Sequence, residues 1–340
     1  MKAKLQQAWQ SRSGLARWLW PVSLLYGLAV GVRHQLYKAG LFSSTRVGVP
    51  VVVVGNLVAG GGGKTPLVIA LVTHLQERGI KAGVISRGYG RIAQSCQEVH
   101  LQTPILESGD EPALIKRATY APVFVARKRA EAAAALLRTH PSTQLIICDD
   151  GLQHHALASD IRIAVFDDRG VGNGWLLPAG PLREHWPAKN HPGVDLILHT
   201  GRTPAFRGFF SERRLADHAV AADGRTVDLR SLVGQPLVAL AAIATPDAFF
   251  SMLVDAGLTL AQTLPLPDHH DFSGYELPVR SGTTVLCTEK DAVKLFQLPA
   301  TTSIRLFAVP LIFRPEPAFM EALDALLAPL LSHLPLNHGH

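Results

Sequence analysis

A cluster of four glycines followed by a lysine and a threonine has the residue types best suited to binding phosphate. The glycines are Gly60, Gly61, Gly62 and Gly63. Glycines allow backbone N–H groups to turn towards phosphate oxygens. A valine run at 51–54 precedes them and an apolar helical pattern at 67–75 follows, so the order is strand, glycine loop and helix. We expect a phosphate-binding loop in which Lys64 reaches the β- and γ-phosphates of a nucleotide and Thr65 holds Mg²⁺.

This loop departs in one place from the strict pattern G-x-x-x-x-G-K-[ST]. The pattern needs a glycine at position 58, where this chain has Val58, although Gly55 and Gly60 keep a four-residue spacing. A glycine hinge that binds nothing is the alternative. The strand pattern before the loop and the helix pattern after it favour phosphate binding.

Two adjacent carboxylates form the second candidate site. Asp149 and Asp150 follow the apolar segment 144–148, which we expect to be a strand beside the valine strand. Two neighbouring carboxylates repel each other unless a cation lies between them. An acid at the end of such a strand commonly manages Mg²⁺ in P-loop enzymes, so we expect a magnesium site rather than a solvated turn.

Two further acidic clusters are weaker signals when each is taken alone. The first is Asp110-Glu111, within the segment GDEP at 109–112 and directly before a helical pattern. An acidic pair at this place is also a good N-terminal cap for a helix. The second is DHHD at 268–271, whose residue types suit metal binding or proton transfer but suit a solvated loop equally well.

Strand patterns alternate with helix patterns along most of the chain, which indicates an α/β fold with a parallel sheet. Further expected strands lie at 82–86, 122–125, 161–166, 194–198, 236–243, 284–287 and 303–309. A length of 340 residues suggests two domains. We expect a P-loop domain at 47–208, a connector or hinge at 209–232, where the pattern breaks into short polar segments, and a smaller α/β domain at 233–340. That smaller domain would include a closing amphipathic helix at 315–334.

Composition and charge limit the functional classes. The three cysteines, Cys96, Cys148 and Cys287, show neither pairing nor metal-ligand spacing, which fits a reducing cytosol. The net charge of +6 is unevenly placed, because residues 1–46 hold seven basic residues and no acidic one, which leaves 26 basic and 27 acidic residues elsewhere. Since the body of the protein is almost neutral, we expect no nucleic-acid partner.

The basic segment 1–46 also contains an apolar run at 18–32. This run is short of the roughly 20 residues needed to span a bilayer, contains Pro21, and is followed by no clear signal-peptide cleavage site. Its tryptophans suit a membrane interface, and the flanking lysines and arginines suit anionic head groups. We expect a membrane-anchoring or interfacial helix, with a helix that simply packs on the domain as the alternative.

Seven motifs occur in order along the chain. They are GNLVAGGGGKTP, SRGYGR, GDEP, DDGLQH, GNGWLLPAGPLR, DHH and TEKDAVK, between Gly55 and Lys294. The series resembles the tetraacyldisaccharide 4′-kinase family, the lipid A 4′-kinases of Gram-negative bacteria, over about residues 15–313. The resemblance implies transfer of the γ-phosphate of ATP, with Mg²⁺, to the 4′-hydroxyl of a tetraacylated glucosamine disaccharide 1-phosphate. The resemblance also implies that the reaction takes place at the cytoplasmic face of the bacterial inner membrane. For the fold, it implies a P-loop domain joined by a strand-like hinge to the smaller domain.

The resemblance implies roles for individual residues. Asp110 would be the general base for the acceptor hydroxyl, and His269, from the second domain, would polarise or orient it. Lys64 would neutralise phosphate charge. The expected contributors to the Mg²⁺ site, directly or through water, are Thr65, Glu111, Asp149, Asp150 and Gln153.

Other residues are expected on the lipid side of the site. The residues that would bind the 1-phosphate or line the sugar site are His154, Arg183, Arg87 and Tyr89. The basic run at 127–129 suits either a phosphate contact or a solvated helix face. Two positions depart from the family pattern, because Gly62 stands where Thr or Ser is usual and His155 where Arg is expected.

Three other functions can be weighed against a lipid kinase. A regulatory GTPase carries N-K-x-D, whereas Lys290 and Asp291 are adjacent here. A partitioning-type ATPase switch carries a second lysine at the start of the loop, where this chain has Ala59. A non-enzymatic membrane scaffold is opposed by the retained acids and histidine. Stimulation of ATP turnover by a lipid acceptor would separate the kinase from all three.

Overall fold

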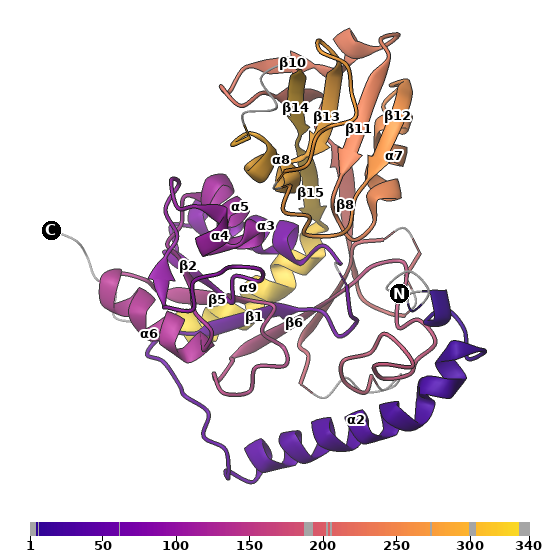
Figure 1. Ribbon diagram of the computed structural model, residues 1–340. Helices are drawn as coiled ribbons and strands as arrows, with labels where there is room; N and C mark the ends of the chain where they lie inside the picture. The colour runs from indigo at the N-terminus through magenta and orange to yellow at the C-terminus, as the bar shows by residue number, and fades with distance from the viewer. Residues whose placement is uncertain are drawn as a thin grey trace, which may run out of the picture.

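The computed structural model shows a larger and a smaller α/β domain and a long amino-terminal helix, α2 (Figure 1). It describes residues 5, 7–60, 62–186, 193–201, 203–204, 206–272, 274–298 and 304–332. Gly61, one of the expected phosphate-binding glycines, lies outside this part of the chain.

The larger domain is built on a sheet with the strand order β15-β8-β7-β6-β1-β5-β2-β4-β3. In that order the strands are Leu311–Pro315, Phe209–Leu215, Leu196–His199, Ile161–Phe166, Val51–Gly55, Leu145–Asp149, Ala82–Ser86, Val123–Val125 and Gln97–Glu98. Every pair from β8 to β4 is parallel, and only the edge strands β15 and β3 pair antiparallel. The predicted α/β fold with a parallel sheet is confirmed.

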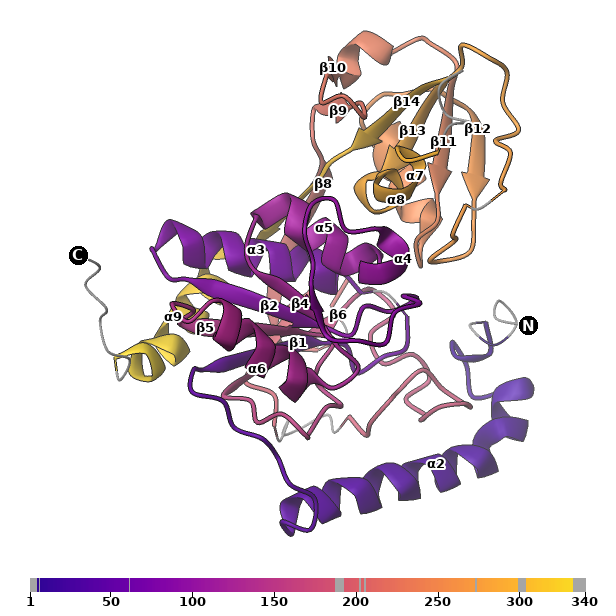
Figure 2. The ribbon, with the colours of Figure 1, turned by 60° about the vertical axis from the view of Figure 1, so that its left-hand side comes forward.

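Helices cover both faces of this sheet, which explains why β1 is an uninterrupted valine run. Val52 and Val54 pack in one core with residues of α3 (Lys64–Glu77), α5 (Asp110–Thr119) and α9 (Pro317–Leu331). Val51 and Val53 face the other way and pack with α6 (Arg129–Thr139). In Figure 2, α3 and α5 lie above the strands and α6 lies below them. A short helix, α4 (Ile105–Ser108), precedes α5.

The smaller domain contains a second sheet, with the order β10-β9-β14-β13-β11-β12. In that order the strands are Thr226–Asp228, His218–Val220, Arg305–Val309, Thr284–Thr288, Leu237–Ala241 and Leu260–Pro265. The four strands from β14 to β12 are parallel, and β9 and β10 pair antiparallel at one edge. The helices of this domain are α7 (Pro246–Asp255) and α8 (Glu289–Leu295), with a 3₁₀ turn, η1, at Leu229–Leu232.

The chain passes between the two domains on a pair of antiparallel strands. β8 leads from the larger sheet into the smaller domain, and β15 leads back, pairing Leu215 with Leu311 and Ser211 with Pro315. The segment expected as a connector at 209–232 is therefore divided, since β8 belongs to the larger sheet while β9, β10 and η1 belong to the smaller domain.

The placement of the closing helix differs from the expectation. The helix predicted at 315–334 is present as α9, but Phe319, Leu323 and Leu327 are buried in the core of the larger domain. The assignment of this helix to the smaller domain is therefore wrong. Its amphipathic pattern predicted a helix and a buried face, but a pattern of this kind does not say which sheet that face will cover.

The helix α2 (Leu15–Lys38) extends the predicted apolar run at both ends and lies along the outside of the larger domain (Figure 1). Only Ala16 and Ser23 are buried along its 24 residues. Its length and mean hydropathy of 1.4 would suffice to cross a membrane, and it is the one such helix among the described residues.

Candidate active site

The glycine loop joins β1 to α3, as predicted. Gly60 and Gly63 have φ angles of 103° and 85°, in the left-handed region that favours glycine. Lys64 and Thr65 begin α3 and are both buried. The buried Thr200, which follows β7 and was not predicted, donates a hydrogen bond of 3.0 Å from Oγ1 to the carbonyl oxygen of Gly62. The loop is thus supported by a residue that follows β7, two strands away from β1 in the sheet.

The lack of a side chain at Gly62 has a local explanation. A Cβ atom there would lie 2.5 Å from Nδ2 of Asn56. That nitrogen donates a 3.2 Å hydrogen bond to the carbonyl oxygen of Gly60. In this chain, therefore, Asn56 occupies the space that a Thr or Ser at position 62 would need.

The predicted acidic pair lies beside the loop. Asp149 ends β5 and aligns with Val54 of β1, so the strand next to the P-loop strand carries an acid at its carboxyl end. Asp149 is fully buried, and Ser86 donates a 3.2 Å hydrogen bond to its Oδ2. Its Oδ1 has no protein partner. Burial, and then the charge of Glu111, raises the pKa of Asp149 to about 7.

The second acid, Asp150, connects two cations. Its Oδ1 lies 3.1 Å from Nζ of Lys64 and 3.1 Å from Nη1 of Arg183. Burial raises the pKa of Asp150, but the charges of Lys64 and Arg183 outweigh burial and leave this pKa below its usual value. Gln153 lies at the same place, because its Oε1 accepts a 3.4 Å hydrogen bond from Arg183.

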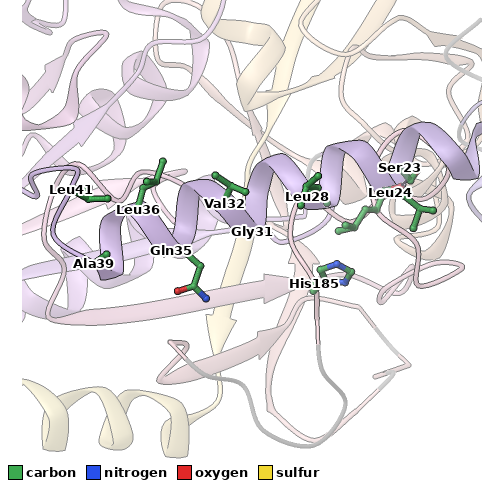
Figure 3. A pocket seen from close by; sticks show the side chains of 12 residues that line it. Ser23, Leu24, Leu28, Gly31, Val32, Gln35, Leu36, Ala39, Leu41 and His185 are labelled. Atoms are coloured by element: carbon green, nitrogen blue, oxygen red, sulfur yellow. Dashed lines mark hydrogen bonds between the residues drawn. The ribbon is translucent and has the colours of Figure 1, made fainter.

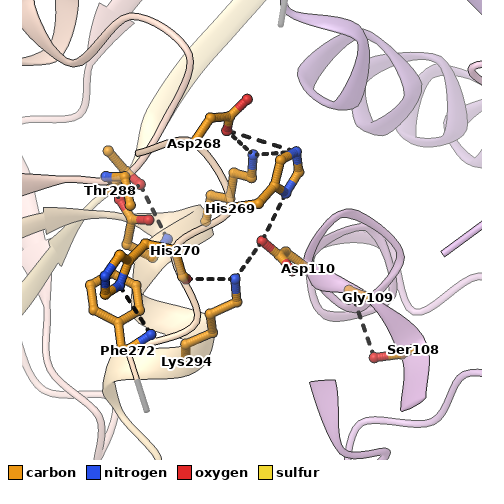
Figure 4. A network of polar contacts seen from close by, with 12 residues as sticks. Ser108, Gly109, Asp110, Asp268, His269, His270, Phe272, Thr288 and Lys294 are labelled. Carbon is orange, nitrogen blue, oxygen red and sulfur yellow. Dashed lines mark hydrogen bonds and ion pairs between the residues drawn. The ribbon is translucent and has the colours of Figure 1, made fainter. Parts of the chain in front are cut away.

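Asp110 and His269 meet across the boundary between the domains (Figure 4). Asp110 begins α5 of the larger domain, and its Oδ2 lies 3.1 Å from Nδ1 of His269 in the smaller domain. Lys294 of α8 donates a 2.7 Å hydrogen bond to the same oxygen. Burial raises the pKa of Asp110, but the hydrogen bonds from His269 and Lys294 outweigh it and lower this pKa to about 2. Asp110 is therefore ionised near neutral pH.

Several of these groups line a cleft of about 1000 Å³ between the two domains. The larger domain contributes Lys64, Thr65, Glu111 and Asp150, and the smaller domain contributes His269. Glu111 was expected at the metal site, and its charge acts on Asp149. A phosphate-binding loop, carboxylates and a histidine thus meet in one space, as phosphoryl transfer requires.

Of the four residues expected on the substrate side, Tyr89 and Arg183 line the cleft, whereas Arg87 and His154 are not among its described lining residues. Tyr89 lies in its lining, with its ring centroid 5.2 Å from that of His269. Burial, and then the charges of Arg129, Arg87 and Arg33, lower the pKa of His154 to about 4. His154 is therefore neutral near pH 7, and the positive charges that act on it would favour an anion nearby.

The basic run at 127–129 was expected to be either a phosphate contact or a solvated helix face. In the structure its three residues have different environments. Arg127 and Lys128 are exposed, whereas Arg129 is buried and donates from Nη2 to the carbonyl oxygens of Asp149 and Asp150 at 3.2 and 3.3 Å. Its Nε and Nη1 have no protein partner. No local pattern distinguishes the buried arginine from its two exposed neighbours.

A second acidic pair escaped the sequence analysis although it has the same signature as the first. Asp167 and Asp168 follow β6, the other neighbour of β1, and both line the cleft with Arg169. Arg169 approaches the glycine loop, because a Cβ on Gly60 would lie 2.8 Å from its Nη1. Testing every strand end for paired acids would have found this pair.

A loop from 172 to 183 connects α2 to the active site. Ser23 of α2 donates a 2.8 Å hydrogen bond to the carbonyl oxygen of Leu176 and accepts one of 2.9 Å from the amide of Ala179. Tyr26 donates to the carbonyl oxygen of Arg183 at 3.0 Å. The loop that contacts α2 at one end thus presents Arg183 to Asp150 at the other.

An apolar groove of about 830 Å³ runs along α2 beside this loop (Figure 3). Its lining includes Leu24, Leu28 and Val32 of α2 together with Leu176 and His185. Apolar side chains exposed in this number on one helix are typical of contact with lipid or another apolar partner.

Among the described residues no group of three or more His, Cys, Asp or Glu side chains has the arrangement of a complete metal cage. Mg²⁺ in nucleotide sites does not need one, since it commonly uses one or two carboxylates with water and phosphate oxygens. The unpartnered Oδ1 of buried Asp149 fits such a site, and Asp150 and Thr65 both line the cleft.

Comparisons with known proteins agree with this geometry. The model of the tetraacyldisaccharide-1-P 4′-kinase family matches residues 15–328. Proteins named tetraacyldisaccharide 4′-kinase from a Polaromonas species and from Polaromonas naphthalenivorans are 64% and 63% identical, covering 98% and 100% of this chain and 99% of each relative. The crystal structure of LpxK from Aquifex aeolicus in complex with ATP matches with a TM-score of 0.78 at 27% identity, covering 94% of this chain and 100% of that one. The chain belongs to the tetraacyldisaccharide-1-P 4′-kinase family, which carries out ATP-dependent 4′-phosphorylation in lipid A synthesis.

Proposed function

We propose that Asp110 is the general base of this 4′-kinase and that His269 orients it. The observation that supports the proposal is the 3.1 Å contact between these two residues, which belong to different domains, with His269 in the lining of the cleft that also contains Lys64 and Thr65. The 4′-hydroxyl of the lipid would give its proton to Asp110 as its oxygen attacks the γ-phosphorus of ATP. The bond between that phosphorus and the β,γ-bridging oxygen breaks, and ADP leaves.

The proposed acceptor is a tetraacylated glucosamine disaccharide 1-phosphate. Its 1-phosphate would bind near His154, where the positive charges of Arg129, Arg87 and Arg33 act. Arg183 adds a further positive charge at the edge of the cleft, where it contacts Asp150. Arginines bind phosphate through paired N–H donors, which suits them to this task.

Transfer to this acceptor is tested by giving the protein γ-labelled ATP and the tetraacyl disaccharide 1-phosphate. Label in the lipid, with its formation dependent on the 4′-hydroxyl, would support the proposed acceptor. ATP hydrolysis without labelled lipid would indicate a P-loop ATPase switch and would contradict the proposal.

We further propose that Mg²⁺ is held by Thr65, Asp149 and Asp150, with Glu111 and Gln153 acting directly or through water. The ion would neutralise charge on the β- and γ-phosphates. Buried Asp149 supports the assignment because its Oδ1 lacks a protein partner. Gln153 is the weakest member, since its amide oxygen contacts Arg183 and its Nε2 donates to the carbonyl oxygen of Asn56.

Chelation of divalent cations should abolish lipid phosphorylation, and added Mg²⁺ should restore it. The expected loss is about a hundredfold or more, because the phosphate charge would otherwise remain unbalanced in the transition state. The assay compares an excess of chelator with chelator followed by excess Mg²⁺, and Ca²⁺, which has the same charge but is larger, serves as a second divalent cation. Full turnover in excess chelator would show that no divalent cation is needed.

We also propose that α2 lies in the plane of the cytoplasmic face of the bacterial inner membrane. Its middle is bound to the catalytic domain through Ser23 and Tyr26, and near its end His34 and Tyr37 contact the ring of His155. A spanning helix could not keep these contacts along its length. The opposite side exposes large apolar side chains, which would enter the headgroup boundary. The apolar groove on α2 would keep an acyl chain of the substrate next to the bilayer.

Replacing Trp18 and Leu25 together by Glu should release the protein from lipid vesicles. These side chains are 86% and 69% exposed and lie outside the apolar groove, so the change adds charge at the proposed membrane face without disturbing a core. Flotation with vesicles of phosphatidylethanolamine and phosphatidylglycerol measures the effect. Val254→Glu on α7, also an exposed apolar residue on a helix, is the matched control and should still float. Flotation of the double variant would contradict the assignment. Comparing protease digestion of the protein in spheroplasts with its digestion in inverted membrane vesicles reports on which face of the inner membrane it lies.

A further inference from the structure

The helix α8 directs two lysines at the pair formed by Asp110 and His269. Lys290 and Lys294 are four residues apart and therefore lie on the same side of the helix. They belong to the segment TEKDAVK at 288–294, to which the proposed function gives no role. Both side chains are largely buried at the boundary between the domains.

Lys294 fixes the position of the Asp110 carboxylate. Its Nζ donates to Oδ2 of Asp110 at 2.7 Å and to the carbonyl oxygen of His270 at 2.9 Å (Figure 4). His269 contacts the same Oδ2 at 3.1 Å. Both side-chain partners of Asp110 thus lie at one oxygen, which leaves Oδ1 as the oxygen for an acceptor hydroxyl.

Lys290 acts on the other side of the histidine ring. Its Nζ lies 2.9 Å from Oδ1 of Asp268 and 3.4 Å from Nε2 of His269. An ammonium group only donates, so Nε2 must be the acceptor and the ring proton must be on Nδ1. Asp268 does not compete for Nε2, since its Oδ1 is 3.7 Å away. Nδ1 of His269 is then the donor to Asp110.

We propose that Lys290 and Lys294 are positioning residues for the base of the kinase reaction. Lys294 holds Asp110 so that Oδ1 faces the acceptor hydroxyl, and Lys290 holds His269 in the tautomer that donates to Asp110. This inference rests on the proposed role of Asp110 and adds to it the two residues that orient the base.

The same contacts make the base dependent on the arrangement of the domains. Asp110 comes from α5, whereas His269 and both lysines come from the smaller domain. A small apolar cluster with Ala113 of α5 and Val293 of α8 joins the two helices. The carboxylate is therefore fully held only while α8 is packed against α5.

The experiment compares Lys294→Met and Lys290→Met with the corresponding arginine variants. Lipid phosphorylation is measured as kcat and as KM for ATP. In each methionine variant kcat should fall about tenfold or more while KM for ATP stays within about twofold, because the lysines orient the base rather than bind the nucleotide. Arginine, which keeps a donor and a charge, should restore part of kcat. Lys81→Met, at an exposed lysine, is the control and should match the unchanged enzyme.

A double variant tests whether Lys294 acts through Asp110. If it does, adding Lys294→Met to Asp110→Asn should lower kcat by less than about twofold further. The inference would be overturned if the losses of kcat in the two single variants multiplied in the double variant. It would also be overturned if kcat were unchanged in Lys294→Met. Lys294→Gln replaces Lys294→Met if thermal unfolding shows that the methionine variant is not folded. Full activity of Asp110→Asn alone would instead overturn the proposed base, whatever the lysine variants do.

The role of Lys290 has a spectroscopic test. In protein labelled with ¹⁵N-histidine, His269 should show the proton on Nδ1, with its signals assigned through His269→Gln. Lys290→Met should shift His269 towards the other tautomer, and Lys290→Arg should restore the first. A proton on Nε2 in the unchanged protein would overturn this part of the inference.

Discussion

Asp110→Asn should lower kcat for lipid phosphorylation about a hundredfold or more and leave KM for ATP almost unchanged. The amide has nearly the shape of the carboxylate but cannot accept the proton of the 4′-hydroxyl. The hydrogen bonds of the Asp110 side chain go to His269 and Lys294 and not to the described residues of the P-loop, so ATP binding should persist. Steady-state kinetics with labelled ATP and the tetraacyl disaccharide 1-phosphate measure both constants.

The effect must be separated from the loss of a charge at a helix N-terminus. Asp110 lies in the first turn of α5, where a negative charge stabilises the helix. Asp247 lies in the first turn of α7, which has the same length of 10 residues, and it is exposed. Asp247→Asn is therefore the matched control and should keep its activity. If Asp110→Asn kept more than about a third of kcat, the base would have to be another group.

Lys64→Met should lower kcat about a hundred- to a thousandfold and also weaken ATP binding. Lys64 is buried at the start of α3, in the cleft beside the glycine loop, where its ammonium can neutralise the charge that develops on the β- and γ-phosphates. In contrast to Asp110→Asn, both kcat and the affinity for ATP should change. Turnover assays and calorimetric titration with a non-hydrolysable ATP analogue measure the two effects.

Lys64→Met also removes the cation beside Asp150, so its effect on folding needs a control. Asp150 keeps its ion pair with Arg183, which limits the charge left unbalanced. Lys81→Met makes the same change at an exposed lysine and should be neutral. Thermal unfolding of both variants shows whether the fold is intact. A folded Lys64→Met variant with normal turnover would contradict the role of Lys64.

Local patterns in the sequence were sufficient for the P-loop and its neighbour. The valine run, the glycine cluster and Lys64-Thr65 are contiguous, so strand, loop and helix follow from adjacent residues. Asp149 also followed from a local rule, because the acid ends a buried strand and buried parallel strands gather around the P-loop strand. The resemblance to a known family added Asp110 and His269, which no local pattern connected.

Other features depended on which distant segments meet. The closing helix α9 was predicted as a helix, but the antiparallel pair β8 and β15 returns the chain to the larger domain before it begins. Arg129 could not be distinguished from its exposed neighbours in sequence, although the fold buries it under Asp149 and Asp150. Burial depends on the tertiary neighbours of a residue, which adjacent residues do not specify.

By itself the sequence determined the chemistry that is available: a phosphate-binding loop, acids at the ends of strands, and an apolar helix that begins among basic residues. Tertiary structure decided how that chemistry is assembled. Asp110 and His269 are 159 residues apart in the chain, and Lys294 is 184 residues from Asp110, yet all three share one carboxylate oxygen. The physical reason is that hydrogen bonds and ion pairs act over about 3 Å, a range that only the packing of α5 against α8 provides.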